Sequence, residues 1–121
     1  MSRIRLTVLL AFAALALAAA TAPAAGPVIP RAGYYEGFDH YHNPIHFFLN
    51  KTKGLLEDIT IADEHFGNAP LQGAQWHHTC NGHRGNLCTR GQWTANHHVS
   101  GIWNDSLQGY EAAFNAVWVS P

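Results

Sequence analysis

Histidine is the residue type in this sequence with the widest capacity for chemistry. The chain has nine histidines in 121 residues, against seven lysines and arginines and eight aspartates and glutamates. In an extended segment His40 and His42 would project to the same side, because side chains alternate along a strand. A pair at this spacing, joined by a third imidazole from His46, could bind Zn²⁺ or Cu²⁺. We therefore predict a metal site at His40, His42 and His46.

Two alternatives compete with this metal site. The histidines could be unrelated surface residues, or together they could form a surface whose charge responds to pH, since histidine ordinarily titrates near pH 6.5. The doublets His77-His78 and His97-His98 are weaker metal candidates, because neighbouring residues in one strand point to opposite faces. Apart from a Zn²⁺ or Cu²⁺ ion at the histidines, no cofactor is expected.

Tryptophan provides the second candidate site. Trp76 precedes His77, and Trp103 precedes Asn104 and Asp105. A flat ring beside a polar side chain suits the recognition of carbohydrate or peptide, since the ring stacks and the polar group orients the ligand. We predict ligand binding at Trp76 and Trp103. The alternative is that all four tryptophans belong to the core.

Signals for catalysis are weak. The chain lacks the G-x-S-x-G motif of many hydrolases, and we predict no catalytic residue. Paired carboxylates could still support glycoside hydrolysis, which keeps a hydrolase as the less favoured alternative. The acids that could supply such a pair are Glu57, Asp58, Asp63 and Glu64.

The two cysteines, Cys80 and Cys88, enclose a segment rich in turn-forming residues. In an exported chain an even number of cysteines is typical of disulfides, and two cysteines allow a single pairing. We predict a Cys80–Cys88 disulfide. The alternative is a Cys/His metal site that includes His77, His78 or His83.

The N-terminus has the pattern of a secretory signal peptide. Arg3 and Arg5 precede an apolar run over residues 6–20, and small residues follow around Pro23. This run is shorter than the roughly 20 residues that a membrane-spanning helix needs. We expect cleavage after Ala24, with Ala25 as the second choice and an uncleaved anchor as the alternative. An extended leader over residues 25–33 and one domain over residues 34–121 would follow, and the product would be secreted, with no membrane span.

Charge restricts the partners of the domain. Two of the seven basic residues lie before residue 25, so the remainder has five basic and eight acidic residues. This balance excludes a nucleic-acid protein with a broad basic face. The expected partner is an extracellular ligand such as a carbohydrate, the cell wall or a protein.

These side chains must be positioned by strands. Apolar and polar residues alternate over 44–50, 55–61, 99–103 and 110–119, and more weakly over 34–38, 74–79 and 89–95. Within 110–119, one face would carry Tyr110, Phe114 and Trp118; within 55–61, one face would carry Leu55 and Ile59. The pattern predicts an all-β fold, a small antiparallel sandwich or barrel of about six or seven short strands with one disulfide.

The sequence also resembles a group of small exported all-β proteins of actinobacteria. The similarity is carried by AGYYEG at residues 32–37, PIHF at 44–47, a central cysteine, GQW at 91–93 and VSGIW at 99–103. It covers about residues 33–118 and consists mainly of core and turn positions. The resemblance implies export and an all-β fold. Together these features favour a non-catalytic domain that binds an extracellular ligand through its surface, with a metal-binding or pH-responsive protein as the alternative.

Overall fold

The computed structural model describes residues 26–81 and 84–121, and this part of the chain forms eight strands and no helix. The predicted signal peptide lies outside the described residues. The all-β expectation is confirmed, with eight strands in place of six or seven. They are β1 (Gly33–Asp39), β2 (Pro44–Asn50), β3 (Leu55–Ile61), β4 (Glu64–Pro70), β5 (Gln75–Cys80), β6 (Leu87–Ala95), β7 (His98–Asp105) and β8 (Tyr110–Ser120).

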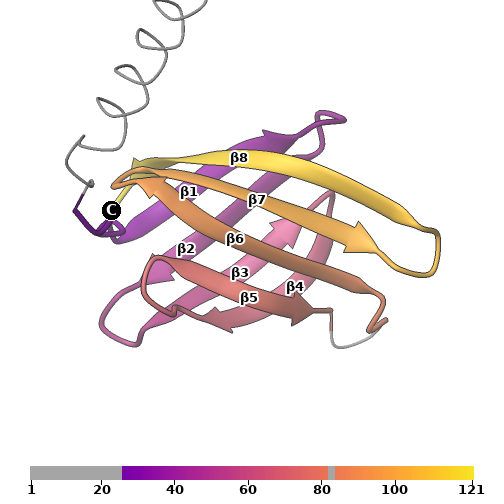
Figure 1. The fold of residues 1–121 in the computed structure, drawn as a ribbon, viewed down its shortest axis with the longest axis horizontal. Coiled ribbons are helices and arrows are strands. Elements are labelled where there is room, and N and C mark those ends of the chain that lie inside the picture. The colour runs from indigo at the N-terminus through magenta and orange to yellow at the C-terminus, as the bar shows by residue number, and fades with distance from the viewer. Residues whose placement is uncertain (1–25, 82–83) are drawn as a thin grey trace, which may run out of the picture.

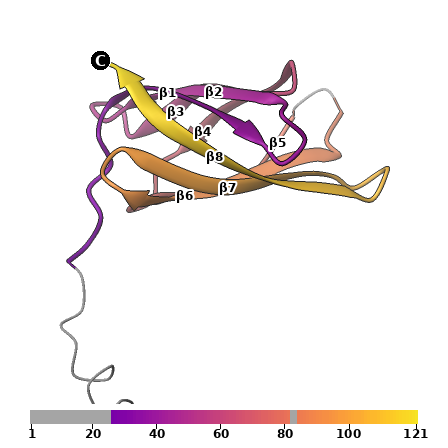
Figure 2. The ribbon, with the colours of Figure 1, turned by 90° about the horizontal axis from the view of Figure 1, so that it is seen from above.

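The strands form a single antiparallel sheet in the order β4-β3-β2-β1-β8-β7-β6-β5. Each half of the described sheet is a four-stranded meander, and the β1–β8 ladder joins the halves. The sheet curls until its two outermost strands, β4 and β5, lie side by side, which gives a nearly closed barrel (Figures 1 and 2). The Asn81 side chain crosses this seam and donates a hydrogen bond to the His65 carbonyl.

Apolar side chains fill the interior of the barrel. Trp76 is buried among them, with its ring 5.5 Å from that of Phe47, 5.9 Å from that of Trp93 and 6.1 Å from that of Phe114. Such aromatic pairs add to the free energy gained by removing the rings from water. The inward-facing aromatic rings therefore provide much of the packing in a chain of this size.

Alternation along three strands matches the sequence prediction. In β2, Ile45, Phe47 and Leu49 are buried, and His46 is exposed. In β8 the buried positions include Ala112, Phe114 and Ala116, on the predicted face. In β7 the buried positions include Val99 and Trp103. These strands have one face in the core and the other toward solvent, so the period of two is strong in the sequence.

In β3 the predicted face is wrong at one position. Leu56 is fully buried and Leu55 is only partly buried, whereas the alternation pointed to Leu55. The cause is Asp58, which has a φ of 54° at an irregularity in the ladder to β4. A bulge of this kind changes which residues face inward, so Leu56 and Ile59 both reach the core although they are three residues apart.

Strand β4 was not expected, because its sequence resembles a turn. It contains Gly67 and ends at Pro70, both residues that favour turns. Such residues are tolerated at the edge of a sheet, and β4 is an edge strand. The β3–β4 hairpin turns at Ala62 and Asp63, with φ values of 53° and 63°, which is the conformation of a type I′ turn.

The predicted disulfide is confirmed. Cys80 and Cys88 face each other in the ladder between β5 and β6, with 4.0 Å between their Cα atoms. A disulfide is typical of proteins in an oxidising compartment outside the cytosol. In the part of the chain that the structure describes, no helix is long and apolar enough to cross a membrane.

Candidate functional site

The three predicted metal ligands do not come together. His40 and His42 lie in the turn between β1 and β2, and His42 has a φ of 64°, so this segment is not the extended chain that the prediction assumed. His46 lies on the outer face of β2. Across residues 26–81 and 84–121, these histidines do not form a group with their ligand atoms within 4.8 Å of one another.

Trp76 and Trp103 are not exposed, contrary to the sequence prediction. Their exposed fractions are 1% and 7%, and both rings lie in the core. Trp93 is also buried, whereas Trp118 is partly exposed. The alternative that the tryptophans belong to the core therefore applies to three of the four. The expected exposure is not found, because alternation identifies a buried face but cannot show whether a lone Trp next to polar residues is on it.

Trp103 belongs to a buried polar network around Asp39. The Trp103 indole N–H and the Asn43 side-chain amide donate hydrogen bonds to Oδ2 of Asp39, at 2.9 Å and 3.0 Å. The backbone N–H groups of Tyr41 and Asn43 donate to Oδ1, at 2.9 Å and 2.8 Å. Burial opposes ionisation of Asp39, yet these four hydrogen bonds hold its pKa below the ordinary value. Every acceptor site of this carboxylate is engaged within the fold, so its role is structural.

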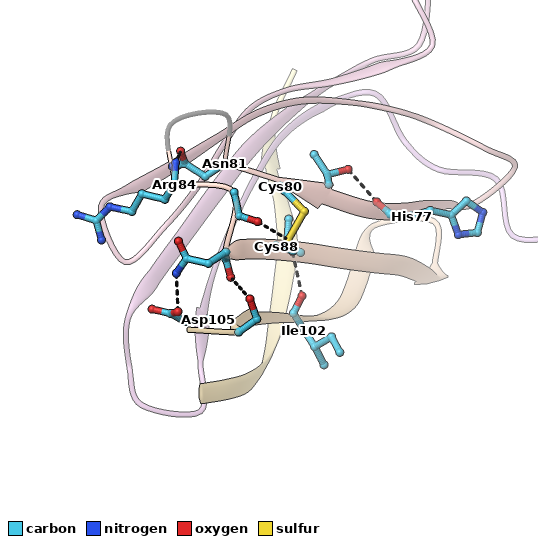
Figure 3. Close-up of a disulfide and its surroundings, with 12 residues drawn as sticks. His77, Cys80, Asn81, Arg84, Cys88, Ile102 and Asp105 are labelled. Carbon is cyan, nitrogen blue, oxygen red and sulfur yellow. Dashed lines mark hydrogen bonds between the residues drawn. A yellow bond between two sulfur atoms is a disulfide. The ribbon is translucent and has the colours of Figure 1, made fainter. Parts of the chain in front are cut away.

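The doublet His77-His78 is arranged differently from the prediction. Between Trp76 and Thr79, β5 has one residue more than the strand it pairs with, β6. This bulge leaves the rings of both histidines exposed, where regular alternation would have buried one. Figure 3 shows the disulfide joining the two strands, with His77 farther along the same strand as Cys80.

Among the described residues, one group of histidine, cysteine and acidic side chains has the spacing of a metal site. It consists of His78, Cys80 and Cys88, with ligand atoms that all lie within 4.8 Å of one another. Both sulfur atoms are held in the disulfide, so neither is available as a thiolate. His83, the other histidine that could join a Cys/His site here, lies outside the described residues.

A groove crosses the outer face of β5, β6 and β7, and we call it the Arg90 groove. Its volume is about 490 Å³. The outward-facing side chains along it are mostly polar, and its floor includes two glycines. The lining residues are Gln75, Trp76, His77, Arg90, Gly91, Gln92, Ser100, Gly101 and Ile102.

A pair of glycines brings the sheet close to the core at this point. Gly91 and Gly101 are partners in the ladder between β6 and β7. A Cβ atom at Gly91 would meet the Trp76 ring at 2.1 Å, and one at Gly101 would meet the Phe114 ring at 2.3 Å. Because neither glycine has a side chain, the sheet lies directly on these core rings.

Arg90 is the basic side chain of the Arg90 groove. The described residues that line the groove include Arg90 and His77 but no acidic side chain, although Glu111 lines a small hollow next to it together with Arg90. The one ion pair in the part of the chain that the structure describes joins Arg84 to Glu64 at 3.4 Å, so no carboxylate lies within ion-pair distance of Arg90 there. A guanidinium in an open groove is suited to bind a carboxylate through two parallel hydrogen bonds.

A second hollow, of about 680 Å³, lies on the outer face of β2, β1 and β8. It is mainly apolar, and Phe38, Val117 and Val119 in it are 61%, 45% and 44% exposed. Ser100 donates a hydrogen bond to the side chain of Asn115 at 3.1 Å. Since Ser100 lines the Arg90 groove and Asn115 lines the apolar hollow, this pair marks the boundary between them.

Sequence reasoning missed the Arg90 groove, although a signal was present. Gly91 and Gly101 fall in the middle of predicted strands, where glycine is unfavourable unless the backbone must approach something closely. Recognising the pair required knowing that the two strands are neighbours in register.

Comparison of the chain with protein-family models, with curated proteins and with solved structures found no match.

Proposed function

We propose that the protein is a secreted, non-catalytic domain that binds an acidic carbohydrate in the Arg90 groove. The observation that carries this proposal is the guanidinium of Arg90, exposed in a groove of about 490 Å³ whose lining, among the described residues, includes no acidic side chain. Secretion is supported by the signal-like N-terminus, by the disulfide, and by the resemblance to small exported all-β proteins.

The other polar groups in the groove suggest a sugar as the carrier of the negative charge. Gln75 and Gln92 each offer two N–H donors and a carbonyl acceptor, and Ser100 offers a hydroxyl. Such groups can both donate to and accept from the hydroxyls of a saccharide. A carboxylate on the ring, as in a uronic acid, would then be bound by Arg90.

The proposal can be tested by titrating the oxidised domain, residues 25–121, with hexagalacturonate while following its amide NMR signals. The Gly91 and Gly101 amides should shift, because they form the floor of the groove. Arg90→Gln should weaken binding about fivefold, since an exposed Arg–carboxylate contact contributes about 1 kcal/mol.

The matched control is Lys51→Gln, which removes the same charge from the exposed β2–β3 turn. It should change the affinity less than about twofold, through the net charge alone. A neutral hexasaccharide such as maltohexaose should bind more weakly than hexagalacturonate. Equal loss of binding in the two variants, or equal binding of the neutral and acidic sugars, would refute the proposal.

A further inference from the structure

We propose that reduction of the Cys80–Cys88 disulfide creates a zinc site formed by His78, Cys80 and Cys88. This inference is independent of the carbohydrate proposal, because it concerns a different group of side chains and the reduced form of the protein. It starts from the finding that the ligand atoms of these three residues already lie within 4.8 Å of one another.

The backbone explains this convergence. Beyond the bulge in β5, Thr79 pairs with the buried Thr89, so His78 and Cys80, on either side of Thr79, share the outer face. Cys88 is the partner of Cys80 in the ladder to β6. Two neighbouring strands therefore present one imidazole and two sulfur atoms to the same point. In tetrahedral zinc sites, ligand atoms are about 3.5–3.8 Å apart, a distance that side-chain rotation can reach here.

Space for an ion exists beside the disulfide. A small hollow of about 110 Å³ is lined by His78 and Cys88 together with Asn104 and Glu111. The fourth coordination position of Zn²⁺ could be taken by water or by the Glu111 carboxylate, both common zinc ligands. Arg90 also lines this hollow, but the two negative thiolates would offset its charge.

Reduction of the disulfide must precede metal binding. A reductant, either a dithiol or a phosphine, supplies two electrons to the sulfur–sulfur bond, and two protons complete the two thiols. Zn²⁺ then displaces both thiol protons and binds two thiolates and the lone pair of a neutral imidazole. Two protons are released for each ion bound. In the oxidised protein the sulfur atoms have no negative charge, so the disulfide excludes the metal.

The experiment uses the 25–121 domain reduced with a phosphine, which is then removed under nitrogen. Co²⁺ reports sulfur ligation through its charge-transfer absorption, and Zn²⁺ affinity follows from displacement of Co²⁺. We expect one ion per chain, bound about 100-fold more tightly than by the oxidised domain, because two thiolate ligands are gained.

Two single variants test the assignment of the histidine. His78→Ala should weaken Zn²⁺ binding at least about tenfold, through the loss of one ligand. His77→Ala is the matched control, since it removes the neighbouring exposed imidazole, and should change the affinity less than threefold, about 0.6 kcal/mol. Circular dichroism of each sample checks that the sheet persists after reduction or is restored by Zn²⁺.

Three results would overturn the inference: a reduced domain that binds Zn²⁺ no better than the oxidised one, a His78→Ala variant equal to the wild type, or a reduced domain that unfolds and is not restored by Zn²⁺. None of them affects the carbohydrate test, because that test is made on the oxidised domain without metal.

Discussion

Replacement of Asp39 by asparagine tests how much the buried polar network at the end of β1 contributes to stability. The carboxylate accepts two hydrogen bonds at each oxygen, and the substitution turns one oxygen into an NH₂ group. In either orientation of the new amide, its NH₂ group would replace an oxygen that accepts two hydrogen bonds. The two N–H groups that donate to that oxygen would then have no acceptor. Because a hydrogen bond to a charged group contributes about 1.5–3 kcal/mol, we expect the free energy of unfolding to fall by about 3 kcal/mol.

The pH dependence of this loss can also be predicted. Native hydrogen bonds hold the pKa of Asp39 below the value of about 3.9 that it has in the unfolded chain. A lowered native pKa stabilises the fold above the unfolded pKa, and this stability is lost as the pH falls through the native pKa. The difference between the wild type and Asp39→Asn should therefore be largest near neutral pH and shrink below about pH 4.

Urea unfolding, followed by tryptophan fluorescence at pH 7 and at pH 3, measures both effects. Trp103→Phe removes one of the N–H donors that would face the new amide. The double variant Asp39→Asn/Trp103→Phe should therefore be about 1 kcal/mol more stable than the sum of the two single changes implies. The control is Glu111→Gln, which removes the charge of an exposed carboxylate in β8. It should lower the free energy of unfolding by less than about 0.5 kcal/mol. A cost below 1 kcal/mol for Asp39→Asn at pH 7, or the same cost at both pH values, would refute the reasoning.

Two further tests probe the backbone. Gly91→Ala should destabilise the domain by about 1–3 kcal/mol, because the new methyl group would meet the Trp76 ring, whereas Gly26→Ala, in open space, should leave urea unfolding unchanged. Equal midpoints for the two variants would contradict close packing beneath the Arg90 groove. Ala62→Asn combined with Asp63→Gly should stabilise the β3–β4 turn by about 0.5–1 kcal/mol, since both positions have positive φ; an unchanged melting temperature would argue against a type I′ turn.

Strands with one face in the core and the other toward solvent were predicted more accurately than the bulge in β3 and the edge strand β4. The bounds expected for β2 and β3, residues 44–50 and 55–61, are those of the structure, and the buried face of β8 is correct. At Asp58 and in β4 the prediction failed, because the outcome depends on a bulge and on position at the edge of the sheet. Neither the bulge nor the edge position can be recognised in the local sequence, where the turn preference of Gly67 and Pro70 is the stronger signal.

The candidate sites were harder to predict than the fold. The Arg90 groove depends on Gly91 lying beside Gly101, and the group around the disulfide depends on a bulge that brings His78 to the face of Cys80. Both arrangements arise from pairing between strands, which alternation within one strand does not specify. The pairing of Cys80 with Cys88 was predictable, because two cysteines allow only one disulfide.

The β1–β8 ladder has a consequence for how the chain folds. Every other ladder in the described sheet joins strands that are consecutive in the sequence, so each four-stranded meander can form through local contacts. The β1–β8 ladder instead pairs Glu36 with Val117 and must close a loop that contains both meanders. Because the entropy of loop closure is lost before such contacts form, this step should limit the folding rate. At this junction Gly37 also lies close to the backbone of Asn115, since a Cβ atom there would lie 1.8 Å from the carbonyl oxygen, the shortest such distance among the described glycines.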